Sequence, residues 1–383
     1  CLIKWYGSHR ESRRSTLAAG GVVSVRHVIA WRSPSTGLNA AAERSENGET
    51  MTAPLSLAVV GYGMTAQSHS RTFNADGHHL RWLVGRVPER AKAFAEQHGY
   101  AYHGASLDDA LSDPEVDAVV LCTPSEQHEA QAIACLDSGK HVLIEIPIAM
   151  SLRGAQRVAE KARASGRVAM VAHTHRYHPG IRLAKAEIDA GRLTPHSITS
   201  RYMFLRRENV GASGYRRSWT DNLLWHHGCH AVDTALWLVG ARVREVETTA
   251  IVALPDAVLG APLDLALVLR TATDRLVNVS MSYNSHLSRY DYVVVGHQDT
   301  LDIRDGVLRE RFTTGPVETS RDAGPSPVVQ QNREFVDAIR EGRAAAIAPD
   351  DVLPAMEALQ VAQEAADAFG TTSLTHQSAA AAL

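Results

Sequence analysis

The most constraining feature of the chain is an apolar run that leads directly into a glycine turn. Leu55–Val60 reads LSLAVV, as expected for a strand buried on both faces. GYGMTA, Gly61–Ala66, follows at once, and helical spacing then continues to about Asn74. In such a turn the first glycine permits a tight bend, the second lets backbone N–H groups approach a pyrophosphate, and the small sixth residue lets helix and strand pack closely. The sequence predicts a dinucleotide-binding unit whose contacts come from Gly61, Gly63, Met64 and Thr65.

Apolar runs and helical segments then alternate, which predicts an α/β fold with a parallel sheet. The candidate strands are 80–84, 100–103, 116–121 and 140–145. Loops at the carboxyl ends of parallel strands face the ligand crevice. Thr123, Pro124, His128 and Glu145 are therefore expected near the nicotinamide end of the cofactor. For His128 the alternative is a histidine at the start of a helix that faces solvent.

The second candidate strand ends in a feature that bears on the choice of cofactor. Gly85 and Arg86 stand where an NAD-binding unit usually carries the acidic residue that holds the ribose 2′-OH. Arg86 and Arg90 could instead pair with a 2′-phosphate. This favours NADP, with NAD possible. The alternative is that Arg86 is an ordinary exposed residue at a helix start.

Composition limits the class of protein. The 383 residues suffice for two domains, and the net charge of −3 gives no electrostatic case for a nucleic acid or membrane partner. The four cysteines form no CxxC pair, which fits a reducing, cytoplasmic setting, and no apolar run approaches the roughly 20 residues of a membrane span. Residues 1–50 are basic and lack a clear period, so we expect a disordered or non-native leader.

Several local strings resemble the Gfo/Idh/MocA oxidoreductases: VVGYGMTA, LCTPSEQH, HVLIEIP and a later helix with His226 and His230. The resemblance covers residues 54–370. It implies an N-terminal NAD(P)-binding Rossmann domain over 51–173. It also implies a C-terminal α/β domain over 174–370 with a large open, mostly antiparallel sheet. That sheet would bind a small carboxylate substrate and form a homodimer or homotetramer. The last residues, TTSLTHQSAAAAL (371–383), are expected to form a frayed tail.

Two departures from the family pattern occur together. Glu145-Ile146-Pro147 replaces the usual Glu-Lys-Pro, whose lysine helps move the substrate proton, and Ile146 can neither donate nor carry charge. His226 stands where sugar and inositol dehydrogenases carry an Asp, one turn before the histidine at 230. In both departures the chain resembles a narrower group within the family, the 4-carboxy-2-hydroxymuconate semialdehyde dehydrogenases. MVAHTHRYHP (170–179) and RRENVGASGYRRSWTDNLLWHHGCHAVD (206–233) resemble that group as well.

The histidines of LLWHHGCHAVD invite three interpretations. Residues 223–239 read as a helix ended by Gly240, with His226 and His230 on one face and His227 roughly 100° away. A zinc site would need more ligands than two histidines four residues apart, so we expect no metal. A purely structural helix would need a partner for every buried ring. Asp233 could fix a ring tautomer.

Acid–base catalysis by His226, His230 or His227 fits the chemistry best. A neutral imidazole can take a hydroxyl proton as hydride leaves the same carbon, which explains how Ile146 is tolerated. The resemblance then implies oxidation of the 4-carboxy-2-hydroxymuconate 6-semialdehyde hemiacetal to 2-pyrone-4,6-dicarboxylate. The alternatives are a sugar- or inositol-type dehydrogenase and a non-catalytic NAD(P)-binding sensor.

Cations on the substrate side suit a dicarboxylate, because arginine binds carboxylates in a bidentate manner. The expected substrate-binding residues are His173, Arg206, Arg217 and Trp219. Ile146 and Arg176 are expected at the cofactor. The alternative for the arginines around NVGASGY is a solvated basic loop.

Overall fold

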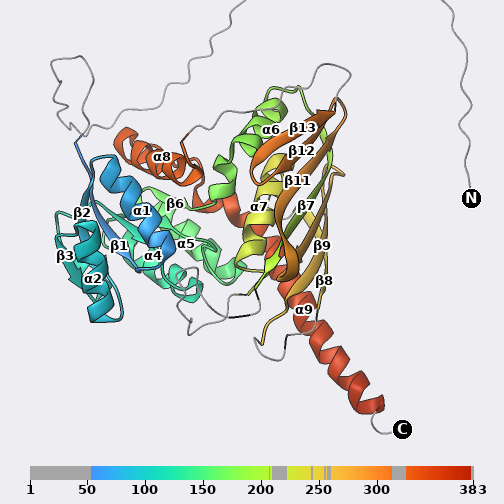
Figure 1. Cartoon of the computed structure of the whole chain (residues 1–383), viewed down its shortest axis with the longest axis horizontal. Coiled ribbons are helices and arrows are strands. Elements are labelled where there is room, and N and C mark those ends of the chain that lie inside the picture. The colour runs from blue at the N-terminus through green and yellow to red at the C-terminus, as the bar shows by residue number, and fades with distance from the viewer. Residues whose placement is uncertain are drawn as a thin grey trace, which may run out of the picture. The chain divides into compact units, whose positions relative to one another are not determined.

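A computed structural model of the chain describes residues 53–206, 208, 222–242, 245–253, 256, 260–312 and 325–380. Within residues 52–383 it contains two sheets (Figure 1). The first is parallel throughout, with strand order β3-β2-β1-β4-β5-β6. Its strands are β1 Ser56–Val60, β2 His79–Val84, β3 Tyr102–Gly104, β4 Ala118–Leu121, β5 His141–Ile144 and β6 Ala169–Val171.

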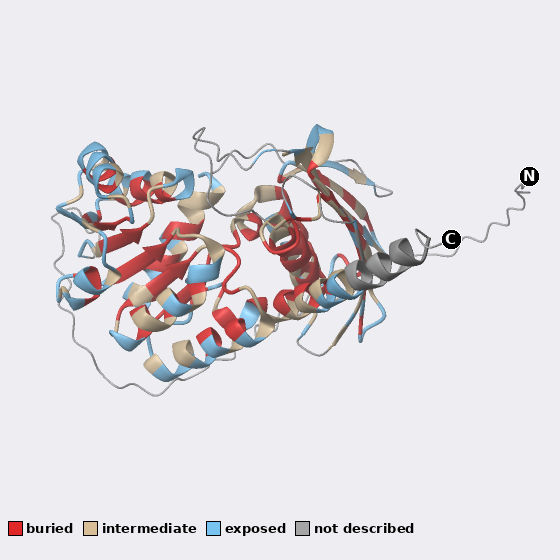
Figure 2. Ribbon diagram, turned by 90° about the horizontal axis from the view of Figure 1, so that it is seen from below, coloured by how far each residue is buried: buried red, intermediate tan, exposed pale blue. Residues whose placement is uncertain are grey.

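Helices cover both faces of this sheet because its strands carry apolar side chains on both sides. They are α1 Met64–Ala75, α2 Pro88–His98, α3 Leu107–Ser112, α4 His128–Asp137 and α5 Leu152–Ser165. All four residues of β4 and the last four of β1 are buried. Figure 2 shows these strands in red between helices whose outer faces are exposed. The predicted Rossmann arrangement is confirmed.

The second sheet has strand order β13-β12-β11-β7-β10-β9-β8, and only the β7–β10 pair is parallel. Its strands are β7 Pro195–Leu205, β8 Val246–Val252, β9 Asp264–Thr271, β10 Leu276–Ser282, β11 Asn284–Gly296, β12 Thr300–Arg304 and β13 Val307–Phe312. Burial alternates along β9, as expected for a sheet with one covered face. Helices α6 Pro179–Asp189 and α7 His227–Val239 pack against this sheet. The predicted large, mostly antiparallel sheet is therefore confirmed.

The last helices return to the first sheet. Helix α8, Pro327–Glu341, packs on α1, and the N–H of Val171 in β6 donates to Ile347 O at 2.9 Å. The short helix η3, Pro349–Val352, precedes α9, Leu353–Ala380, which contacts α5, α7 and β8. Helix α9 continues past residue 370, where we expected a frayed tail, because its alanine-rich end has no proline to stop it. Among the described helices, none combines the length and apolar character needed to span a bilayer.

Candidate functional site

The glycine turn presents an open helix N-terminus. Gly61 has φ +111°, and a Cβ there would lie 2.5 Å from Cys122 O, so only glycine fits. Gly63 is the N-cap of α1, and a Cβ there would meet no atom within 4 Å. Gly63, Met64 and Thr65 are exposed. Backbone N–H groups at such a helix end suit a pyrophosphate, so these residues fit the nicotinamide dinucleotide that the turn predicts.

The carboxyl end of β2 carries the predicted cations. Gly85 lies against Tyr62, since a Cβ at Gly85 would be 2.4 Å from the ring. The Arg90 guanidinium lies over the same ring, 4.6 Å from its centroid. Arg86 is exposed. Two guanidinium groups therefore border the end of the strand where a ribose would be held.

The loops after β4 and β5 are tied together by a buried histidine. His128 Nδ1 lies 2.7 Å from Pro147 O and its Nε2 lies 2.9 Å from Thr123 O. Its ring is buried, so the solvent-facing alternative is wrong. Thr123 Oγ1 donates to Gln131 Oε1 at 2.6 Å, and Pro124 leads into the short helix η1, Ser125–Gln127. His128 thus braces the loop that carries Thr123.

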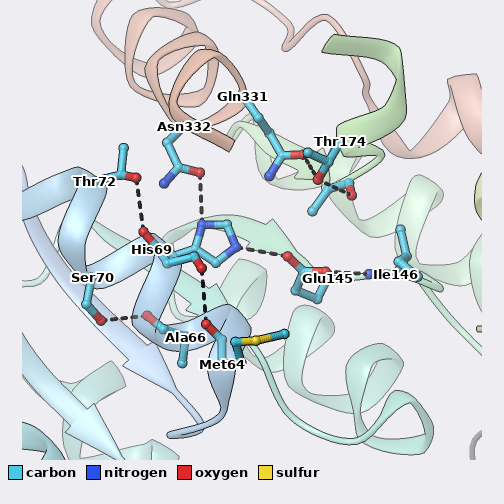
Figure 3. Close-up of polar contacts among 12 residues, drawn as sticks. Met64, Ala66, His69, Ser70, Thr72, Glu145, Ile146, Thr174, Gln331 and Asn332 are labelled. Carbon is cyan, nitrogen blue, oxygen red and sulfur yellow. Dashed lines mark hydrogen bonds and ion pairs between the residues drawn. The ribbon is translucent and has the colours of Figure 1, made fainter. Parts of the chain in front are cut away.

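Glu145, directly after β5, belongs to a buried polar chain that the sequence did not predict (Figure 3). Its Oε1 lies 2.9 Å from His69 Nε2, and His69 Nδ1 lies 2.9 Å from Asn332 Oδ1 on α8. His69 shares the buried face of α1 with Ala66 and Phe73. The sequence signal that could have identified His69 is a polar ring, at helical spacing, on an otherwise apolar helix face. Ile146, next to Glu145, is only 5% exposed.

His227 and His230 of α7 face different parts of the structure, the large sheet and the segment after β6. His226 precedes the helix as its N-cap, and Leu223–His226 form a turn. His227 Nδ1 is hydrogen-bonded to the Tyr283 hydroxyl, and its ring lies 5.0 Å from that of Tyr202 on β7. His227 thus faces the large sheet.

His230 instead faces the segment after β6. Its ring stacks on His175 at 4.3 Å between centroids and meets His173 edge-on at 5.6 Å. Burial lowers the pKa of His230 and His175 well below the usual value, and neighbouring histidines add to this. Burial also lowers the pKa of His173 to about 4. These rings are therefore neutral at neutral pH, and each is a weaker base than a free imidazole.

His175 and its partners were missed by the sequence analysis, although MVAHTHRYHP contains the residue. His175 belongs to the short helix η2, Thr174–Tyr177, and its Nδ1 lies 3.3 Å from the Tyr292 hydroxyl. Tyr290 stacks on the same ring at 5.0 Å. We use the term histidine cluster for His173, His175, His226, His227 and His230.

Asp233 holds Arg176 and not the histidine of its own helix. Arg176 Nε and Nη2 donate to the Asp233 carboxylate at 2.8 and 2.6 Å, and the guanidinium lies 5.1 Å from the Trp237 centroid. The nearest histidine nitrogen is His173 Nδ1, 3.3 Å from Asp233 Oδ2. A buried carboxylate needs a cation, so α7 turns Asp233 towards η2. This pair uses Nε and Nη2 of Arg176, and the expected contact of Arg176 with the cofactor stays a prediction.

The substrate-binding predictions fall partly outside the described residues, where Arg217 and Trp219 lie. Arg206 follows β7; its N–H donates to Tyr283 O at 2.7 Å and its guanidinium lies over the Tyr283 ring at 5.6 Å. His173 is 2% exposed, at the carboxyl end of β6. Arg206 and the histidine cluster therefore meet through Tyr283 and His227.

Comparison with known proteins agrees with this arrangement. Residues 55–173 match the family model described as "Oxidoreductase family, NAD-binding Rossmann fold", and 179–293 match "Bacterial oxidoreductases, C-terminal". The 4-carboxy-2-hydroxymuconate-6-semialdehyde dehydrogenase of Sphingobium sp. SYK-6 is 33% identical over 75% of this chain and 91% of its own length. The chain belongs to the Gfo/Idh/MocA family.

Two further proteins are less similar to this Gfo/Idh/MocA protein than the Sphingobium enzyme is. The inositol 2-dehydrogenase 2 of Saccharopolyspora erythraea is 30% identical over 49% of this chain and 55% of its own. The solved structure of GenD2 from gentamicin A biosynthesis, in complex with NAD, is 25% identical with a TM-score of 0.69, covering 86% of this chain and 97% of that chain. As a Gfo/Idh/MocA member the protein is an NAD(P)-dependent oxidoreductase that acts on a CH–OH group.

Proposed function

We propose that this oxidoreductase converts the cyclic hemiacetal of 4-carboxy-2-hydroxymuconate 6-semialdehyde to 2-pyrone-4,6-dicarboxylate, with NADP as the preferred cofactor. The observation that carries the proposal is the histidine cluster, which joins the end of β6 to α7 in a chain where Ile146 replaces the family lysine. The similarity to the Sphingobium enzyme supports the same substrate class.

The chemistry divides between the two halves of the chain. Gly61, Gly63, Met64 and Thr65 would hold the dinucleotide, with Thr123, Pro124, Glu145 and Ile146 at its nicotinamide end and Arg86 and Arg90 at a 2′-phosphate. When bound, the nicotinamide supplies the acceptor for the hydride lost from the hemiacetal carbon. His230 accepts the hydroxyl proton as the ring carbonyl forms, and His226 is the second candidate. The lowered pKa of His230 makes it a weaker base than a free imidazole, but it lets the protonated ring release that proton readily.

The substrate side would bind carboxylates. We propose Arg206 and Arg217 as the groups that hold them, with Trp219 and His173 beside the ring of the substrate. Arginine suits this task because its planar fork matches a carboxylate. We further propose a cytoplasmic homodimer or homotetramer that associates through the open face of the seven-stranded sheet, where Val268 and Leu276 are exposed.

The proposal is tested by nicotinamide reduction with freshly ring-cleaved protocatechuate, offered with NADP and with NAD. We expect rapid reduction with NADP, and a fall in kcat of about 100-fold or more for His230→Ala. His297→Ala is the matched control, because this exposed histidine follows β11 away from the cluster. If His226→Ala and His230→Ala both leave turnover intact, the assignment of the base is wrong.

A sugar- or inositol-type activity is the second candidate, favoured by the 30% identity to an inositol 2-dehydrogenase. The absence of a lysine at 146 argues against it. Reduction with inositols or sugars, and none with the ring-cleaved substrate, would select this alternative.

A further inference from the structure

Two consecutive amides on α8 reach into both halves of the site (Figure 3). Gln331 and Asn332 are 0% and 1% exposed. Gln331 Oε1 accepts from Thr174 Oγ1 at 2.9 Å, and Thr174 lies between His173 and His175 of the histidine cluster. Asn332 Oδ1 lies 2.9 Å from His69 Nδ1. One turn of a C-terminal helix therefore contacts the segment that carries the histidines and the helix that follows the glycine turn.

The Asn332 contact continues to a carboxylate. His69 is 1% exposed, so neither ring nitrogen depends on solvent, and its Nε2 lies 2.9 Å from Glu145 Oε1. The Glu145 side chain is 17% exposed. The chain of contacts thus begins in the core at Asn332 and ends at a partly open carboxylate, at the carboxyl end of β5.

Stability alone is a poor explanation for these amides. In the part of the chain that the structure describes, neither Asn332 Nδ2 nor Gln331 Nε2 has a hydrogen-bond partner. A buried donor without an acceptor costs free energy that an apolar side chain of similar size would not. Such groups are retained where they specify geometry, and both contacts end at groups of the candidate site.

We propose that His69 and Asn332 are positioning residues for Glu145. Held by Asn332, the His69 ring fixes the Glu145 carboxylate at the nicotinamide end of the dinucleotide site. Gln331, through Thr174, holds the same helix turn against the histidine cluster. Helix α8 thereby sets the distance between the carboxylate and the proton-accepting histidines. The part of the proposal that concerns the histidine cluster rests on the proposed function. The part that concerns Glu145 requires only that the dinucleotide binds at the Rossmann turn.

The test is a double-mutant cycle on His69→Ala and Glu145→Ala, read by fluorescence titration of NADPH and NADH and by kcat. We expect each single variant to weaken dinucleotide binding or lower kcat by about 10-fold. The double variant should be no worse than Glu145→Ala, because His69 acts only through that carboxylate. His69→Gln should recover part of the loss, since an amide N–H can still donate to Glu145.

Arg333→Ala is the matched control on the same helix. Arg333 binds Asp76, the residue after α1, at 2.9 and 2.7 Å, so it also links α1 to α8 but touches neither His69 nor Glu145. It should leave dinucleotide affinity unchanged, whereas Asn332→Ala should lower it. If His69→Ala does not fold, the cycle is run with Asn332→Ala.

Two results would overturn the proposal. Fully additive losses in the double variant would mean that His69 and Glu145 act separately. Equal losses for Arg333→Ala and Asn332→Ala would mean that α8 matters only for packing. Dinucleotide titration needs no substrate, so either result is distinguishable from failure of the hemiacetal assignment, which would show as normal binding without reduction.

Discussion

Arg86 is the side chain that we propose distinguishes NADP from NAD. It is exposed at the carboxyl end of β2, while its neighbour Arg90 stacks on Tyr62. The stacking on Tyr62 orients the Arg90 guanidinium before any ligand arrives, whereas the exposed Arg86 side chain would lose rotamer freedom on binding a phosphate. The two arginines would thus contribute differently to the binding of a 2′-phosphate: Arg90 through its fixed position and Arg86 through its charge.

Arg86→Ala should weaken NADPH binding by about 10-fold and leave NADH binding unchanged, because only NADPH carries the extra phosphate. Parallel fluorescence titrations of the two nucleotides measure this. Arg71→Ala, which removes an exposed arginine from α1, should change neither. Equal losses for both nucleotides in Arg86→Ala would contradict a role at the 2′-phosphate.

Sequence reasoning found site residues where a local motif defined them and missed those brought in from elsewhere. The glycine turn and the α7 histidines lie in short strings with their own chemistry. Asn332 is 263 positions from His69, and nothing local to α8 indicates that contact. His175 could have been predicted, since it lies between His173 and Arg176 in a quoted string. The sequence predicted that Asp233 could fix a ring tautomer but not its ion pair with Arg176, because only the fold brings η2 against α7.

At the scale of elements, the glycine turn offers a matched pair of substitutions. Gly61→Ala forces a Cβ to within 2.5 Å of Cys122 O at φ +111°. We expect loss of about 2 kcal/mol or more of unfolding free energy. Gly63→Ala meets no protein atom within 4 Å, so the fold should keep its stability while dinucleotide affinity falls. Denaturant unfolding and NADPH titration of both variants separate the two effects.

A different result would locate the dinucleotide elsewhere. Unchanged NADPH affinity in Gly63→Ala would mean that the phosphates do not approach this helix end. Equal destabilisation by the two substitutions would contradict the assignment of Gly61 as the sterically obligatory glycine.

The predicted strands of the first sheet match β1 to β5 to within two residues at each end, because apolar runs bounded by glycine or proline mark them. The first half of β11, from Asn284, is polar and half-exposed, so no apolar run marks where that strand begins. Helix α7 starts four residues after the predicted start because the Asn222 side chain accepts the Leu224 N–H at 2.9 Å and holds a turn there.

At the scale of the whole molecule, buried histidines couple stability to pH. His141 Nδ1 accepts the Val168 N–H at 2.9 Å, and burial lowers its pKa to about 4. Below the unfolded value of about 6.5 the unfolded chain binds a proton that the folded protein does not. The contribution of each such histidine to the unfolding free energy is therefore complete above about pH 6.5. As the pH falls from there towards about pH 4, the unfolding free energy decreases by at most roughly 1.4 kcal/mol per pH unit for each group.

Denaturant unfolding across this window measures the slope. His141→Gln should give a shallower slope than the wild type, because one proton-linked group is gone. His79→Gln, at an exposed position of β2, serves as the control and should leave the slope unchanged. A slope identical in wild type and His141→Gln would contradict the assignment.

The return of α8 to the first sheet has a consequence for engineering. Chain order suggests a nucleotide-binding cassette that could be cut out after β6 and fused to another substrate domain. That cassette would lack Asn332 beneath His69 and Ile347 beside Val171, and would expose the face of α1 that α8 covers. Hybrids within this family should therefore keep the pieces before about residue 174 and after about residue 326 from one parent, and the exchanged insert must match α9, which packs on its α7 and β8.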